Sequence, residues 1–251
     1  MLKKNIILSS FITTILAISG CSSDGVSTGE AVAIGAGLVT ASLLDKSDIK
    51  EIASQAAKKM DSEHELASSG SQYHTRLQRL IASIENRDKY NFKVYQSEKI
   101  NAFAMADGTI RVYSGLMDIM SDAELLAVIQ HEIGHVERQH VYEQTKEMLY
   151  TDAAFKAVIA AGGTVGELTQ SQLGQLAYKA VNAHFSQKDE LEADAYAVKS
   201  LAHMNHDPVA MKNSIKALQE HSGGGGGFLS SHPSSEERIT QIEQQIARLK
   251  Q

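Results

Sequence analysis

The fold is decided by residues 121–136, which read SDAELLAVIQHEIGHV. Ser121 and Glu124 have the spacing of a capping box at the start of a helix, and the apolar residues that follow recur at helical intervals. The pattern predicts a helix over residues 121–150. Residues 131–135, HEIGH, form an H-E-x-x-H motif. Its two histidines, His131 and His135, are one helical turn apart and therefore project from the same face. Two imidazoles on one face can bind one metal ion.

A catalytic zinc site normally uses three protein ligands, so a third ligand must come from elsewhere in the chain. The metzincin continuation of the motif is absent, because Arg138 and Val141 stand where it requires Gly and His. The inverted order H-x-x-E-H is absent too. His140 falls off the ligand face of a straight helix, and we expect it to have a structural role.

Residues 185–194 read FSQKDELEAD and lie in a run of helix-forming residues. Glu190 and Asp194 share a helix face, so one carboxylate can bind the metal while the other accepts the free ring N–H of a ligand histidine. Acidic pairs at this spacing are commonly solvated, and the upstream histidines are what favour the metal site. We expect Asp189 and Glu192 to face solvent.

Hydrophobic periodicity predicts an α+β fold, mostly helical, with a small β-sheet before the H-E-x-x-H helix. The expected strands are residues 91–95, 101–105 and 109–113. The expected helices are residues 45–60, 71–88, 121–150, 179–203, one that begins at Asp207-Pro208, and a terminal one through Ile239. An apolar helical hairpin is expected to begin at Ala153–Ala161, break at Gly162-Gly163 and run back towards Leu173 and Leu176.

Four spaced blocks make the chain resemble the gluzincin family of zinc peptidases that includes HtpX, BepA and the prenyl-protein endopeptidases. The blocks are residues 101–117, 131–135, 190–194 and 231–239. The resemblance spans residues 43–251 and is strongest to short lipoprotein members. It implies one Zn2+ per chain, with His131, His135 and Glu190 as ligands and Asp194 beside them.

Glu132 is the expected catalytic base, because it follows the first ligand histidine and can take a proton from water. Arg238 lies in the fourth block of the resemblance and could support the ligands or, like a tyrosine, assist the oxyanion, although the sequence does not place either residue in space. Arg238 could equally pair with Glu236 or Glu237. These alternatives stay open at the level of sequence.

His232 follows a run of five glycines, Gly223–Gly227. Consecutive glycines are costly to order, so the run predicts a mobile loop that delivers this histidine. Three roles remain open for His232. It could be a fourth metal ligand that displaces water and silences the enzyme, a catalytic donor to the oxyanion, or a surface residue beside Pro233.

The strand expected at Asn101, Ala102, Phe103 and Ala104 has a possible role in substrate binding. An exposed edge strand beside a metal cleft can pair with an extended chain through backbone hydrogen bonds. The family resemblance implies the same location. The alternative is an ordinary strand covered by the rest of the domain.

Residues 1–20 read as a lipoprotein signal peptide. Lys3 and Lys4 precede an apolar run over residues 6–18, and small residues precede Cys21, the sole cysteine. A short anchor helix is the alternative, but the run is shorter than the roughly 20 residues that span a bilayer. We expect a lipid, including palmitate, on Cys21, and Ser22 after it indicates sorting to the outer membrane, facing the periplasm of a Gram-negative cell.

The domain organisation expected after cleavage is a tether and apolar stalk, residues 21–44, followed by a peptidase domain, residues 45–251. The stalk could contact a membrane or a partner, or pack on its own domain. HtpX and the prenyl-protein endopeptidases have several membrane-spanning helices, and BepA adds helical repeats. Residues 21–251 contain neither a spanning apolar run nor a repeat period, so we expect a peptidase domain on a lipid tether.

Composition excludes a nucleic-acid partner, because the net charge is -6 and Lys and Arg do not cluster beyond the signal peptide. The expected function is a membrane-tethered zinc endopeptidase that hydrolyses unfolded or misassembled envelope proteins, with the outer-membrane assembly machinery as a partner. One alternative is a zinc-stabilised chaperone or assembly factor that does not cut, although binding alone does not need Glu132. Another is an amidase that acts on peptidoglycan.

Overall fold

A computed structural model describes residues 45–152, 155–156, 168–221 and 227–249. The expected signal peptide, Cys21, the tether, most of the hairpin at residues 153–163 and glycines 223–226 lie outside these residues. The described helices are α2 (Lys46–Glu63), α3 (Gln72–Ile81), α4 (Ser114–Ile119), α5 (Asp122–Glu137), α6 (His140–Thr151), α8 (Gln170–Asn182), α9 (Gln187–His203), α10 (Val209–His221), α11 (Phe228–Ser231) and α12 (Glu236–Leu249), with a 3-10 turn at Arg87–Lys89. The strands are β1 (Asn91–Tyr95), β2 (Ala102–Ala104) and β3 (Thr109–Tyr113).

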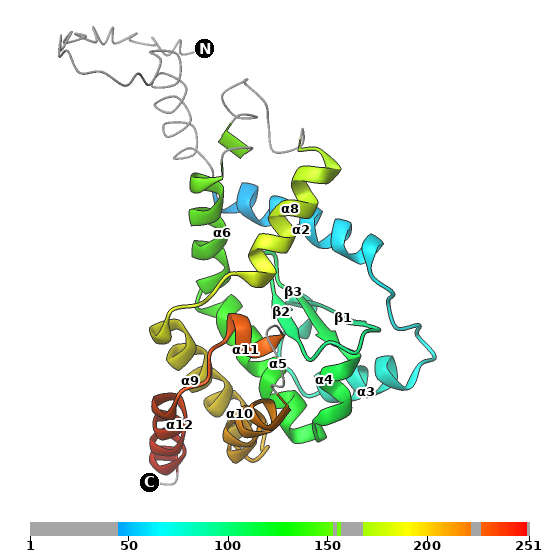
Figure 1. Ribbon diagram of the computed structural model, residues 1–251. Coiled ribbons are helices and arrows are strands. Elements are labelled where there is room, and N and C mark those ends of the chain that lie inside the picture. The colour runs from blue at the N-terminus through cyan, green and yellow to red at the C-terminus, as the bar shows by residue number, and fades with distance from the viewer. Residues whose placement is uncertain (1–44, 153–154, 157–167, 222–226, 250–251) are drawn as a thin grey trace, which may run out of the picture.

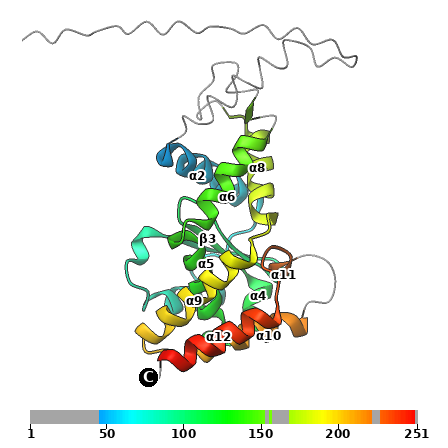
Figure 2. The ribbon, with the colours of Figure 1, turned by 90° about the vertical axis from the view of Figure 1, so that its left-hand side faces the viewer.

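The fold is α+β and mostly helical, with one small sheet ahead of the H-E-x-x-H helix, as the sequence predicts. Figure 1 shows α2, α6 and α8 on one side of the sheet and α9, α10 and α12 towards the other. The view in Figure 2 keeps the same separation, with α2 and α12 at opposite ends. No helix in the described part of the chain has the length and apolar character needed to cross a membrane.

The three strands run in the order β1-β3-β2, so β2 lies at an edge. β1 is parallel to β3, and β2 is antiparallel to it with Ala102 opposite Val112. At the ends of this pair the N–H of Tyr113 donates to the carbonyl of Asn101, and that of Met105 to Thr109. Because pairing alternates along an antiparallel strand, the backbone groups of the two alanines of β2 point to the free edge.

Side chains alternate across the sheet and enter two apolar clusters. The cluster on the α5 side contains Val94, Ala102 and Val112 together with residues of α3, α4, α5, α9, α10 and α12. The other contains Tyr95 and Phe103 with residues of α2, α6 and α8. Because successive side chains of a strand point to opposite faces, β2 packs against both apolar clusters.

The sequence predicts one helix over residues 121–150, but the structure has two, α5 and α6. The prediction of a continuous helix was wrong where they meet. Gln139 has φ 64°, a left-handed conformation that ends a helix. The N–H of Arg138 donates to the carbonyl of Gly134, and that of Gln139 to Val136. His140 consequently starts a new helix in a new direction.

The helix-forming run over residues 179–203 is also interrupted. Ser186 caps α9, accepting from the backbone N–H of Asp189 while the Asp189 carboxylate accepts from Ser186. Asp189 is therefore part of a capping box rather than only a solvent charge. The helix expected over residues 71–88 ends at Ile81.

Helices α5 and α9 pack closely where Gly134 meets Ala193. A Cβ atom built on Gly134 would lie 3.1 Å from both the Cα and the carbonyl oxygen of Ala193, which is tighter than most real contacts. The missing side chain lets the two backbones approach. This contact places the histidines of α5 opposite the carboxylates of α9.

Candidate active site

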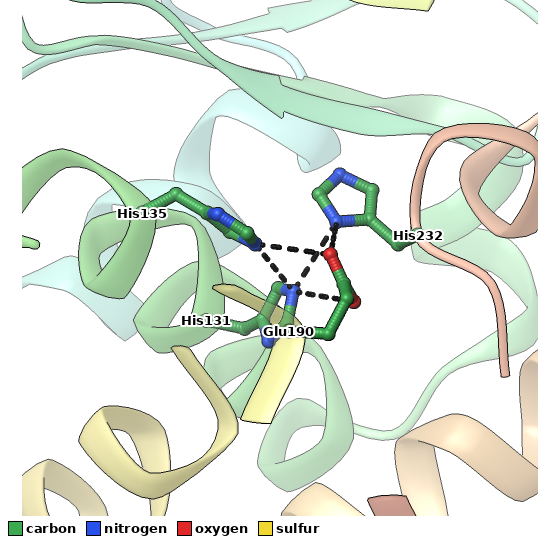
Figure 3. A group of neighbouring side chains, drawn as sticks. All are labelled: His131, His135, Glu190 and His232. Atoms are coloured by element: carbon green, nitrogen blue, oxygen red, sulfur yellow. Dashed lines mark hydrogen bonds and ion pairs between the residues drawn. The ribbon is translucent and has the colours of Figure 1, made fainter. Parts of the chain in front are cut away.

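Four side chains converge from three segments of the fold. His131 and His135 come from α5, Glu190 from α9, and His232 follows α11. One ligand atom from each lies within 4.8 Å of all the others, and all four residues are buried. Figure 3 shows the three rings and the carboxylate pointing towards one another.

The spacing of these atoms fits a zinc ion. The Nε2 atoms of His131 and His135 are 3.1 Å apart, and His135 Nε2 is 3.3 Å from Glu190 Oε1. His232 Nδ1 is 3.0 Å from the same oxygen and 3.3 Å from His131 Nε2. Zinc bonds of about 2.0–2.1 Å in a tetrahedron give edges of about 3.3 Å, and imidazole nitrogens with a carboxylate oxygen are zinc ligands. The donor set therefore fits this metal.

Asp194 and Arg238 lie on the side of His131 that faces away from the cluster. His131 Nδ1 donates to Asp194 Oδ1 at 2.9 Å, which leaves its Nε2 facing the cluster. Arg238 donates to both oxygens of Asp194, at 2.8 and 2.7 Å, and its Nη1 lies 2.5 Å from Glu190 Oε2. Burial raises the pKa of the Asp194 carboxyl, but the Arg238 charge together with the hydrogen bonds from Arg238 and His131 outweighs burial and holds that pKa below its usual value.

The structure thus places Arg238 on two carboxylates of the site. The alternative that it pairs with Glu236 or Glu237 does not describe its contacts among the described residues. Its Nη1 also donates to the carbonyl of Pro233 at 3.2 Å, so it ties the segment after His232 to α9.

Glu132 lies beside the cluster without belonging to it. Its Oε1 is buried, has no hydrogen-bond partner among the described residues, and is 3.5 Å from His232 Nε2. The backbone of Ala104 hydrogen-bonds the carboxyl group. Burial raises the pKa of Glu132, and the neighbouring Glu190 charge adds to this effect. A buried carboxyl with a raised pKa is suited to accept a proton.

His232 is 1% exposed and does not lie on the surface. Its ring stacks on Phe228 with centroids 4.3 Å apart, and Phe185 lies 5.1 Å away. The N–H of Phe228 donates to the carbonyl of Ile100 at 2.9 Å, which fixes this segment beside the start of β2. As a fourth ligand His232 would complete the tetrahedron, so the arrangement fits a closed site.

The predicted substrate strand lies against the same site. The backbone groups of Ala102 and Ala104 point to the edge of β2 that pairs with no strand among the described residues. Ala102 is 0% exposed there and its N–H donates to the Asn101 side chain at 3.0 Å, while the backbone of Ala104 bonds to Glu132. Phe103 instead points into the apolar cluster with Tyr95 and Tyr113. A cavity of about 580 Å³ adjoins the Asn101 end and is lined in part by α8 and α11.

Sequence reasoning missed two neighbours of His135. His140 Nδ1 lies 3.1 Å from His135 Nδ1, and Glu192, expected to face solvent, has Oε2 at 3.2 Å from His140 Nε2. The ring of Phe185 lies 3.8 Å from the ring of His135, between centroids. The position of His140 five residues after His135 could have indicated a contact between them. We find no sequence signal for Phe185.

Comparison with known proteins gives related enzymes over most of the chain. The model of peptidase family M48 matches residues 67–246. The metalloprotease LoiP of Escherichia coli (strain K12) is 40% identical over 208 residues, which are 81% of this chain and 82% of LoiP. The metalloprotease YcaL of the same organism is 35% identical over 251 residues, 98% of this chain and 99% of YcaL. A beta-barrel assembly-enhancing protease of Yersinia pestis is 27% identical over 192 residues, 68% of this chain and 38% of that protein.

Proposed function

Because this chain belongs to peptidase family M48 and is a zinc metalloendopeptidase, we propose that it degrades unfolded or misassembled proteins of the cell envelope. The observation that carries this proposal is the position of β2 beside Glu132, at a sheet edge that pairs with no strand among the described residues. Backbone pairing at such an edge accepts any extended chain and excludes a folded one. The name of the Yersinia pestis relative supports a role near outer-membrane protein assembly.

The residues of the site divide the work of peptide hydrolysis. His131, His135 and Glu190 would hold the zinc ion, which when bound would supply Lewis-acid activation of water and of the scissile carbonyl. Glu132 takes the proton of the attacking water and later passes it to the leaving amine. Asp194 keeps the ring of His131 in the binding orientation, and Arg238 fixes Asp194.

The proposed location is the outer membrane, facing the periplasm, through a lipid on Cys21. The sequence of residues 1–21 supports this, and the peptidase domain would then reach its substrates on a short tether. Fractionation of cells that express the Cys21→Ser variant tests it. Equal membrane association of parent and variant would contradict a lipid anchor.

The function is tested by digestion of one outer-membrane β-barrel protein in two states, freshly diluted from urea and folded in detergent micelles. The full-length enzyme is loaded with zinc, and each state is followed by gel electrophoresis. We expect rapid cleavage of the unfolded state and resistance of the folded state. Equal rates for the two states would contradict a quality-control role.

A zinc-stabilised assembly factor that binds chains without cutting them is the second candidate. The four-residue ligand set, which includes His232, favours it because four protein ligands are typical of structural zinc. Absence of cleavage by both the parent and the His232→Ala variant, with zinc bound and aggregation of the β-barrel protein suppressed, would establish this candidate instead.

Replacing His232 with Ala is expected to raise the rate of peptide cleavage. The distances of 3.3 Å from His232 Nδ1 to His131 Nε2 and of 3.0 Å to Glu190 Oε1 support a role as fourth ligand, whose removal would open that position. If the site is open about a tenth of the time, the increase is about tenfold. Steady-state cleavage of a fluorogenic peptide measures it, with His221→Ala, an exposed residue of the neighbouring cavity, as control. A loss of activity would indicate an oxyanion donor, and no change would exclude both roles.

Replacing Ala104 with Pro is expected to lower kcat/KM for long unfolded chains about 2- to 10-fold. Proline removes the N–H at the free edge, and the loss of one backbone hydrogen bond costs about 0.5–1.5 kcal/mol. The control is Ala104→Ser, which keeps the N–H. A short reporter peptide separates the two uses of this N–H, because an equal loss for the reporter would indicate that only its contact to Glu132 matters.

A further inference from the structure

His135 has a second partner on the side away from the ligand cluster. Its Nδ1 lies 3.1 Å from Nδ1 of His140, the first residue of α6. His140 is 8% exposed, and Gln139 in its left-handed conformation turns it towards α5. The two ring nitrogens are within hydrogen-bond distance, so one of them must donate.

The direction of that hydrogen bond follows from the ligand atom of His135. Nε2 faces the cluster, and a metal ligand nitrogen must be unprotonated. The neutral ring then carries its proton on Nδ1 and donates it to Nδ1 of His140. The other nitrogen of His140 carries a proton in turn and donates to Glu192 Oε2 at 3.2 Å, with Asp189 Oδ1 at 3.6 Å. In this hydrogen-bonded series from His135 through His140 to Glu192, each donated proton has an acceptor.

The two ligand histidines of α5 are therefore held by different means. His131 donates directly to Asp194, which is buried and paired with Arg238. Nδ1 of His135, by contrast, is linked to a carboxylate through a second imidazole, that of His140, and the side chain carrying this carboxylate, Glu192, is 41% exposed. Partners of this kind fix the tautomer and orientation of metal ligands elsewhere.

We propose that His140 is a positioning residue that holds the zinc ligand His135 in its binding tautomer and orientation, and that Glu192 fixes His140. Phe185 covers the face of the His135 ring, with centroids 3.8 Å apart, and so limits its tilt. Among the described residues, His140 is the hydrogen-bond partner of Nδ1 of His135. The proposal rests on the zinc site and not on the identity of the substrate.

The test is the zinc affinity of His140→Phe and His140→Asn in the full-length protein, by competition with a chromophoric chelator. Phenylalanine keeps the ring volume but offers no acceptor, and we expect zinc binding about 10–100-fold weaker. Asparagine places Oδ1 near the position of Nδ1 and can accept the hydrogen bond. We expect it to recover most of the affinity, because its oxygen restores the acceptor for His135.

Two controls separate positioning from packing. His203→Phe changes an exposed histidine of α9 and should leave zinc affinity unchanged. Glu192→Leu should weaken zinc binding. Glu63→Leu should not, although it also removes a carboxylate that pairs with a lysine one helical turn earlier. Zinc affinity of His140→Phe within about threefold of the parent, or equal losses in the Phe and Asn variants, would overturn the proposal.

Thermal melting of the zinc-free variants reports whether each one folds. If His140→Phe does not fold, the comparison of Glu192→Leu with Glu63→Leu decides the question, and equal zinc affinity of these two variants overturns the proposal. The d–d absorption of the cobalt-substituted proteins gives a second readout, since a reoriented ligand changes it. None of these measurements depends on protein cleavage, so their failure and failure of the proposed function are distinguishable.

Discussion

The Glu132→Gln variant is expected to lose about 100- to 10,000-fold in kcat/KM while it binds zinc as the parent does. Glutamine keeps the size of the side chain but cannot accept a proton from water. Glu132 is outside the ligand cluster, so the metal site should be unchanged. Its Oε1 has no hydrogen-bond partner among the described residues, so replacing that atom breaks no hydrogen bond of the fold.

The measurement combines cleavage of a fluorogenic peptide with zinc content after gel filtration. Glu137→Gln is the matched control, because Glu137 lies on the same helix and bonds to the hydroxyl of Tyr90 rather than to the site. We expect this control to keep parental activity. A Glu132→Gln variant that retains a tenth of the activity with zinc bound would point to another base.

Replacing Arg238 with Met is expected to destabilise the zinc-free protein by about 3–5 kcal/mol. Arg238 is buried with Asp194 and Glu190, and its removal leaves two buried carboxylates without their cation. Methionine fills similar space, so the cost is mainly electrostatic. We also expect weaker zinc binding, because Asp194 would no longer hold His131 in place.

Urea denaturation monitored by circular dichroism measures this change. Arg79→Met provides the comparison, since Arg79 pairs with Asp122 at 2.6 Å but its side chain is 62% exposed. An exposed pair of this kind contributes about 1 kcal/mol or less. If Arg238→Met is no more destabilising than Arg79→Met, the buried pair does not have the structural role that its contacts indicate.

The H-E-x-x-H helix and its partner could be predicted because their signals are local. Capping residues, helical periodicity and the four-residue spacing of His131 with His135, and of Glu190 with Asp194, each depend on a few adjacent positions. That these two helices contribute to one site was predicted from the order of the four blocks, which resembles that of the family. The α+β class followed from three short alternating strands.

The remaining contacts of the site could not be predicted because they depend on where helices turn. Gln139 adopts φ 64° although it is not glycine, and this conformation carries His140 to His135. The role of Arg238 stayed open because its partner Asp194 lies 44 residues earlier in the chain. Neither contact has a signature in the adjacent sequence.

The close approach of Gly134 to Ala193 sets the distance between the metal-binding side chains of α5 and those of α9. The separation of His131 and His135 is set within α5, but every distance from them to Glu190 spans two helices. A side chain at position 134 would push the helices apart and lengthen only the second kind of distance. The size of the ion that the site accepts is therefore governed in part by a residue that does not contact it.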